Sequence, residues 1–141
     1  MQRVEQHIIK RSDPRFAPID AAAFKAKNLY NAALYLVRQA YIFEGRYLGY
    51  EAVYHQMKGH EAYRALPTKV AQQILRLLDK NWQSYFAACQ AYQEDPSRFR
   101  KHPKMPHYKQ KRWRQRESYQ PINSCLLIRN YNRVKIIWLC L

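Results

Sequence analysis

The chain has few of the residues on which most catalytic sites depend. Only 10 of its 141 residues are Asp or Glu, and after Glu94 and Asp95 the one remaining carboxylate is Glu117. Glu51 and Asp79 stand on expected helix faces rich in Lys and Gln, so we interpret both as solvated surface charges. The histidines show no HxH or HExxH spacing, and the 3 glycines form no phosphate-cradling motif. We therefore expect a chain that is not an enzyme by itself, binds no cofactor and has no small-molecule substrate.

The chain also lacks paired cysteines and long hydrophobic runs. Cys89, Cys125 and Cys140 are widely spaced and form no CxxC pair. They are more typical of buried thiols than of a disulfide framework or a zinc site. No run of 18 apolar residues is present, and the start of the chain, MQRVEQHIIKR, lacks the apolar core of a signal peptide. We expect a cytoplasmic protein that does not bind a membrane.

Positive charge, by contrast, is abundant. The 25 Lys and Arg residues give a formal net charge of +15, and self-repulsion of that size disfavours compaction unless a counter-charge binds. The charge is densest in residues 97–116, which contain no Asp or Glu, and Pro103 and Pro106 prevent this segment from forming one continuous helix. If the segment were only a solvated basic loop without a partner, its interleaved aromatic rings would be exposed apolar surface with no role. Cations that alternate with rings favour nucleic acid as the partner.

The predicted nucleic-acid-binding residues are the cations of this segment and two of its rings: Arg98, Arg100, Lys101, Lys104, Tyr108, Lys109, Lys111, Arg112, Trp113, Arg114 and Arg116. Lys and Arg would neutralise phosphates, while Phe99, Tyr108 and Trp113 would stack on bases, each contributing on the order of 1–3 kcal/mol. If about six cations contact the phosphates of a duplex, the salt slope of binding should be about −5. We expect His102 and His107 to stack on or hydrogen-bond to nucleic acid.

Three regions follow one another along the chain. Residues 1–19 contain a predicted strand at 3–10 and a proline-containing loop at 11–19. Residues 20–96 are predicted to be helical, and residues 97–141 combine the basic segment with β-type runs at 126–128 and 134–139 that flank a turn at 130–132.

The helical region has its own start and stop signals. Asp20 is a predicted cap for a long helix that ends at Gly45, and a short helix is predicted at 50–58. Thr68 is the predicted cap of a second long helix that ends before Asp95. Together these signals predict an α+β fold. In it an antiparallel helical block, with two long helices and one short, is inserted into a small split β-structure made by the N-terminal and C-terminal strands.

Five stretches of the chain resemble a known family. The sequences LPTKVAQQI at 66–74, LLD at 77–79 and WQSYF at 82–86 look like the N-terminal region of the OrfB/TnpB transposon proteins encoded by insertion sequences. KMPHYKQK at 104–111 is similar to the proline-and-lysine segment that follows the helices in that family, and LYNAALY at 29–35 fits its first helix. The resemblance covers about residues 3–120 and depends on order and spacing.

The resemblance implies a fold and a function. Family members are RNA-guided DNA nucleases, described earlier as transposases with a helix-turn-helix region. Their N-terminal third is a split β-barrel wedge with an inserted helical recognition block, which grips guide RNA and the guide–target duplex and helps read a short flanking DNA motif. Cleavage belongs to a later RuvC-like domain, with three carboxylates and a divalent metal, and to a zinc ribbon.

This chain departs from the family after the basic segment. It has no place for the three carboxylates or the paired cysteines, and residues 125–128 and 138–141 match poorly. We expect a truncated or frameshifted remnant, or a fragment, that binds guide RNA or DNA without a catalytic centre of its own. Two alternatives stay open: a stand-alone helix-turn-helix DNA-binding protein, and a basic structural or interaction protein. The helix-turn-helix pair would be 50–58 and the start of the 68–94 helix, but the connection at 59–67 is long for that motif.

Overall fold

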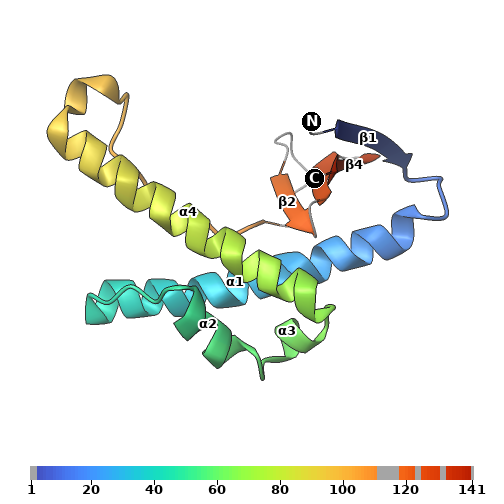
Figure 1. The fold of residues 1–141 in the computed structure, drawn as a ribbon, viewed down its shortest axis with the longest axis horizontal. Helices are drawn as coiled ribbons and strands as arrows, with labels where there is room; N and C mark the ends of the chain where they lie inside the picture. Colours follow the sequence, from blue (N-terminus) through green and yellow to red (C-terminus); the bar gives the residue numbers. More distant parts are fainter. Residues whose placement is uncertain (1–2, 111–117, 123–124, 131–132, 141) are drawn as a thin grey trace.

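The computed structural model describes residues 3–110, 118–122, 125–130 and 133–140, with side chains from residue 9 to residue 110. In chain order the elements are β1 (Arg3–Lys10), α1 (Phe16–Glu44), α2 (Tyr50–Met57), α3 (Glu61–Arg64), α4 (Thr68–Glu94), the 3₁₀ turn η1 (Pro96–Arg98), β2 (Ser118–Ile122), β3 (Cys125–Asn130) and β4 (Arg133–Cys140). Helices dominate the described residues (Figure 1), which confirms the prediction of a chain rich in helix.

The core lies where α1 and α4 cross. Apolar side chains recur every three or four residues on each helix, which places them on one face. The two helices contribute the largest fully buried side chains, which are Leu29, Tyr30, Leu34, Val37, Ile74, Leu75, Leu78 and Trp82. α2 and α3 close this core on one side (Figure 1) with buried Val53, Met57 and Tyr63. The predicted packing of two long helices is therefore confirmed.

α1 begins at Phe16, so the prediction of a loop through residue 19 and of a cap at Asp20 is wrong. Pro18 favoured a loop in the sequence analysis. A proline in the first turn of a helix is nevertheless tolerated, because the N–H that it lacks has no helical partner there. Asp13 holds the turn before the helix by accepting hydrogen bonds from the backbone N and the guanidinium of Arg15, and these bonds lower the pKa of Asp13 to about 2. At the other end, Gly45 has φ 63°, which confirms the predicted stop.

The segment between α2 and α4 contains an additional short helix that the sequence did not predict. α3 is a single turn, and the His60 side chain caps it by accepting a hydrogen bond at Nδ1 from Ala62 N–H, 3.1 Å away. α2 itself was correctly predicted. Thr68 is not the cap of α4 but its first residue, after Pro67, and no side chain caps that end.

Asp79 is not the solvated surface charge that its neighbours suggest. One of its oxygens, Oδ1, accepts hydrogen bonds from the Tyr47 hydroxyl at 2.7 Å and from the Tyr50 backbone N–H at 3.1 Å. Burial, reinforced by the bond to Asp79, raises the pKa of the Tyr47 hydroxyl. Asp79 therefore fastens the start of α2 to α4, whereas Glu51 is exposed as expected.

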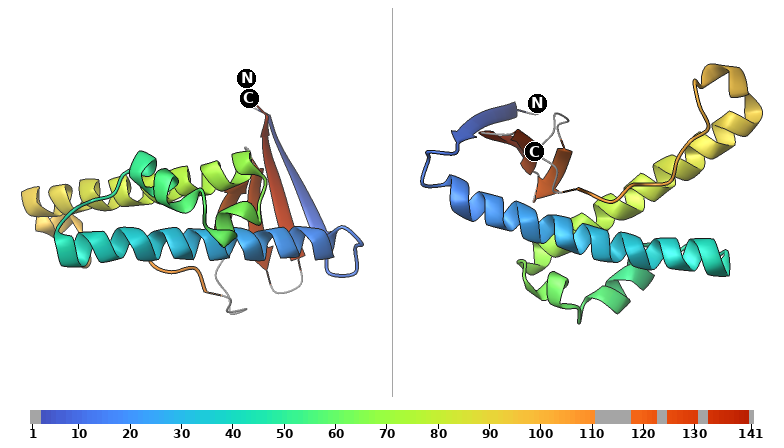
Figure 2. Two further views of the ribbon diagram at one scale, coloured as in Figure 1. Left: turned by 90° about the horizontal axis from the view of Figure 1, so that it is seen from below. Right: turned by 180° about the vertical axis from the view of Figure 1, so that it is seen from behind.

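The four strands form one antiparallel sheet in the order β1-β4-β3-β2. β1 pairs with β4 from Arg3 opposite Cys140 to Lys10 opposite Arg133, which brings the two ends of the chain together (Figure 1). The sheet stands beside the N-terminal half of α1 (Figure 2). The helices thus follow one edge strand in the sequence and precede the other three strands. Tyr131 and Asn132 of the predicted turn lie outside the described residues.

Candidate nucleic-acid interface

The basic segment turns back at the end of α4 and then follows that helix toward α1 (Figure 2). Asp95 starts the turn, since its side chain accepts a hydrogen bond from Ser97 N–H at 3.1 Å and so caps η1. Beyond the turn, the rings of Phe99 and His102 pack against Tyr92, with centroid distances of 5.8 and 4.9 Å. The start of the segment is thereby held on the last turns of α4.

A paired hydrogen bond fixes the far end of the described segment to α1. Asn31 donates from Nδ2 to the Lys109 carbonyl oxygen at 2.9 Å and accepts at Oδ1 from the Lys109 N–H at 2.8 Å. A side-chain amide offers a donor and an acceptor side by side, so it can pair with a backbone residue much as another strand would. Residues 99–110 form no helix or strand, yet both ends of this stretch have fixed partners.

The cations of the described segment differ in exposure. Arg98, Arg100, Lys101 and Lys104 are exposed to solvent. Lys109 is half-buried, its Nζ lies 5.2 Å from the centroid of the Tyr30 ring, and burial lowers the pKa of its ammonium group. The first four can reach phosphates without rearrangement.

α1 adds a cation to the same surface. The Arg38 guanidinium lies 5.2 Å from the centroid of the exposed Tyr108 ring. Lys27, Asn31 and Arg38 fall at i, i+4 and i+11, which places them on one stripe of the helix about 16 Å long. Asn31, which holds the basic segment through the Lys109 backbone, thus lies between two cations of α1. Sequence reasoning considered the Lys25, Lys27 and Arg38 helix only as an alternative binding surface and did not place Arg38 beside the basic segment, because only the folded chain brings it to Tyr108.

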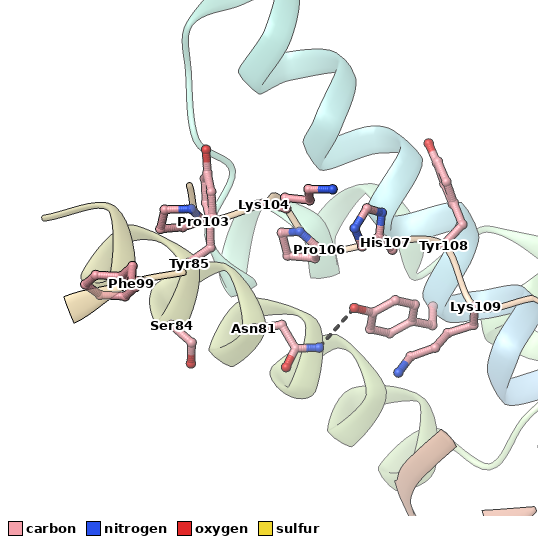
Figure 3. Close-up of a pocket in the computed structure, with 12 residues that line it drawn as sticks. Asn81, Ser84, Tyr85, Phe99, Pro103, Lys104, Pro106, His107, Tyr108 and Lys109 are labelled. Atoms are coloured by element: carbon pink, nitrogen blue, oxygen red, sulfur yellow. Dashed lines mark hydrogen bonds between the residues drawn. The ribbon is translucent and has the colours of Figure 1, made fainter. Parts of the chain in front are cut away.

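A pocket of about 570 Å³ lies between α4 and the basic segment (Figure 3), and Tyr30 of α1 is one of its lining residues. Its walls are mostly aromatic and proline side chains, and its lining residues are Tyr30, Asn81, Ser84, Tyr85, Ala88, Phe99, Pro103, Lys104, Pro106, His107, Tyr108 and Lys109. Asn81 Nδ2 donates to the Tyr30 hydroxyl oxygen at 2.9 Å, and Ser84 Oγ donates to the Lys80 carbonyl at 2.9 Å. Burial raises the pKa of the Tyr85 hydroxyl to about 12, so this group stays protonated at neutral pH.

The predicted site residues are distributed over this surface as follows. Lys104, Tyr108 and Lys109 line the pocket, and Phe99 lines it too, although one side of its ring is used against Tyr92. Arg98, Arg100 and Lys101 are exposed in the turn beyond it. Lys111, Arg112, Trp113, Arg114 and Arg116 lie outside the described residues.

The contribution of α4 to the pocket was missed. Asn81 and Ser84 border the apolar stripe of α4 that contributes Leu78 and Trp82 to the core, and Tyr85 belongs to that stripe. Polar residues at i and i+3 beside such a stripe are a weak signal, because most of them are simply solvated. Only the position of the returning segment gives them a shared role.

Other kinds of site find little support in the part of the chain that the structure describes. No three His, Cys, Asp or Glu side chains lie close enough there to hold a metal ion. None of the described helices has the length and apolar content that a bilayer crossing requires. The predicted helix-turn-helix pair is interrupted, because α3 stands between α2 and α4 where that motif has a turn of three or four residues.

Comparison with known proteins gave no relative: no family model matches the chain, and no curated protein matches it. The resemblance to the OrfB/TnpB N-terminal region stays a prediction that rests on the residues described above.

Proposed function

We propose that this chain binds nucleic acid through the basic segment and the faces of α1 and α4 that hold it. The observation that carries the proposal is the anchoring of an acid-free, cation-rich segment at Tyr92 and at Asn31, with four of its cations facing solvent. Because the segment is already anchored, binding costs less conformational entropy than it would if a loose loop had to be ordered. Phosphates would lie along the exposed cations, and unpaired bases would contact the rings between them.

The finer proposal follows the resemblance to the TnpB-like proteins. In it the strands act as the wedge, the helices act as the recognition block, and the bound nucleic acid is guide RNA, DNA or both. The chain would act in the cytoplasm as the binding part of a transposon-encoded protein, without a nuclease centre of its own. Support comes from the position of the helices in the sequence, between the edge strand β1 and strands β2 to β4.

The test compares two variants of equal charge. In the first, Arg98, Arg100, Lys101 and Lys104 are changed to Ala. In the second, four exposed cations elsewhere, Lys10, Arg11, Lys58 and Arg64, are changed to Ala. Affinity for a labelled single-stranded RNA, for the matching DNA strand and for a DNA duplex is measured by fluorescence anisotropy.

We expect the first variant to lose about tenfold or more in affinity, and the control to lose no more than about threefold, because it loses only long-range attraction. Equal losses in the two variants would contradict the proposal, since binding would then depend on net charge alone. Tight binding to the duplex only, without any RNA, would favour the helix-turn-helix alternative.

A further inference from the structure

The 570 Å³ pocket between α4 and the basic segment has a chemical character of its own. Its volume lies within the range of pockets that bind small organic molecules. Tyr85, Phe99 and Tyr108 supply aromatic surface, and Pro103 and Pro106 supply flat apolar surface on the segment side (Figure 3). A planar, partly apolar group is the kind of ligand that such walls accommodate.

The polar groups of the pocket narrow the choice of ligand. Asn81 uses its Nδ2 on the Tyr30 hydroxyl, which leaves its carbonyl oxygen free to accept. Ser84 uses its hydrogen on the Lys80 carbonyl, which leaves lone pairs on its own oxygen. Both side chains come from the α4 wall, and both can accept hydrogen bonds from a planar heterocycle with N–H groups.

The charges around the pocket point to a ligand attached to a polyanion. Lys104 and Lys109 are part of the lining, and exposed Arg98, Arg100 and Lys101 continue the positive surface along the segment. A free apolar metabolite would gain nothing from these cations, whereas a nucleotide within a strand has a phosphate on each side of its base. Charge complementarity thus favours a base carried by a strand.

We propose that the pocket receives one unpaired nucleobase of a bound single strand, with the flanking phosphates on Lys104 and Lys109. The base has to be unpaired, because a base within a duplex is stacked and cannot enter a pocket. This inference rests on the proposed function and adds to it a defined position for one base.

The test blocks the pocket without changing any charge. Ala88 lines the pocket, while its neighbour Ala87 on α4 is exposed and does not line it. Ala88→Phe therefore fills the pocket, Ala87→Phe is its matched control, and Ser84→Phe fills the pocket from an exposed position in case Ala88→Phe does not fold. Circular dichroism verifies the fold of each variant.

Each protein is titrated with an oligodeoxynucleotide and with a strand of the same length made only of abasic sugar phosphates. In the parent chain we expect the base-containing strand to bind at least about tenfold more tightly. A pocket-filling substitution should reduce that ratio severalfold and leave affinity for the abasic strand unchanged, whereas Ala87→Phe should leave both unchanged.

An unchanged ratio in the folded pocket-filling variants, with salt-dependent binding intact, would overturn this inference and leave the proposed function standing. If the parent chain itself shows no salt-dependent binding to either strand, both this inference and the proposed function are wrong.

Discussion

Asp79 and Asn81 stand two residues apart on α4 and have opposite fates. Two residues correspond to about 200° around a helix, so the two side chains point to different sides. Asp79 accepts hydrogen bonds from the Tyr47 hydroxyl and from the Tyr50 backbone N–H, and these contacts join α4 to the start of α2. Asn81 is joined to Tyr30 but also borders an open pocket with cations in its wall. One side of α4 is thus a closed junction that holds the fold, and the other is a surface on which a ligand could bind.

The largest effect on stability should come from the closed side. Asp79→Ala removes two hydrogen bonds to a carboxylate and leaves the Tyr47 hydroxyl without its acceptor, which we expect to lower the free energy of unfolding by about 2–3 kcal/mol. Urea unfolding measures this change. Glu51→Ala, at an exposed position of α2, is the control and should change stability by less than about 0.5 kcal/mol.

Asp79→Ala, still folded at low temperature, should bind nucleic acid at least as tightly as the parent chain. Removal of a negative charge should if anything strengthen binding to a polyanion. A weakened complex would mean that the junction side also contacts the ligand.

Compared with Asp79→Ala, Asn31→Ala should lower the stability less and weaken nucleic-acid binding more. It removes both hydrogen bonds to the Lys109 backbone, which should cost about 1–2 kcal/mol of stability because the released backbone groups can reach water. Binding of single-stranded RNA should weaken severalfold, since the segment then has to be ordered by the ligand. Asn28→Ala, one turn earlier on α1, is the matched control. Equal affinities for the two variants would show that the anchor serves the fold only.

Lys109→Met tests whether the half-buried cation is kept for binding. The pKa of Lys109 is lowered by burial, so between that lowered value and 10.5 the unfolded chain holds more protons than the folded one. Stability of the parent chain should therefore rise with pH across this window, and Lys109→Met should abolish the rise. At neutral pH the variant should be as stable as the parent chain or slightly more stable, yet bind nucleic acid more weakly.

Affinity of the parent chain should also fall as the pH rises through the lowered pKa of Lys109, because a neutral amine does not neutralise a phosphate. Lys101→Met, at an exposed position, removes the same charge and is the control for stability at neutral pH, which it should change by less than about 0.5 kcal/mol. A variant that is clearly less stable at neutral pH would show that Lys109 serves packing rather than binding.

The parts of the fold that were predictable are those encoded in local patterns. The ends of α1 at Gly45 and of α4 at Glu94, and the whole of α2, follow from glycine, proline and apolar spacing. The start of α1 was missed because Pro18 is tolerated in a first turn, and α3 was missed because a single turn has no periodicity to detect.

The candidate site shows the same division. A run of cations without acids can be read directly from the order of the residues, so the basic segment was predicted. The role of Asp79, the pairing of Asn31 with Lys109 and the pocket wall at Asn81 each join residues that lie far apart in the chain. Nothing local marks such contacts, because an Asn or Asp on a helix has the same neighbours whether it is solvated or paired.

The most direct test of the central claim is the salt dependence of binding to single-stranded RNA. The number of phosphates that a protein neutralises sets the slope of log affinity against log salt, at about −0.7 per phosphate for a single strand. In one variant Arg98, Arg100, Lys101 and Lys104 are changed to Ala, and in the charge-matched control Lys10, Arg11, Lys58 and Arg64 are changed to Ala. The slope of the first should be smaller in magnitude than that of the control by about 3. Slopes that agree within one phosphate contact would contradict the claim that the basic segment is the nucleic-acid interface.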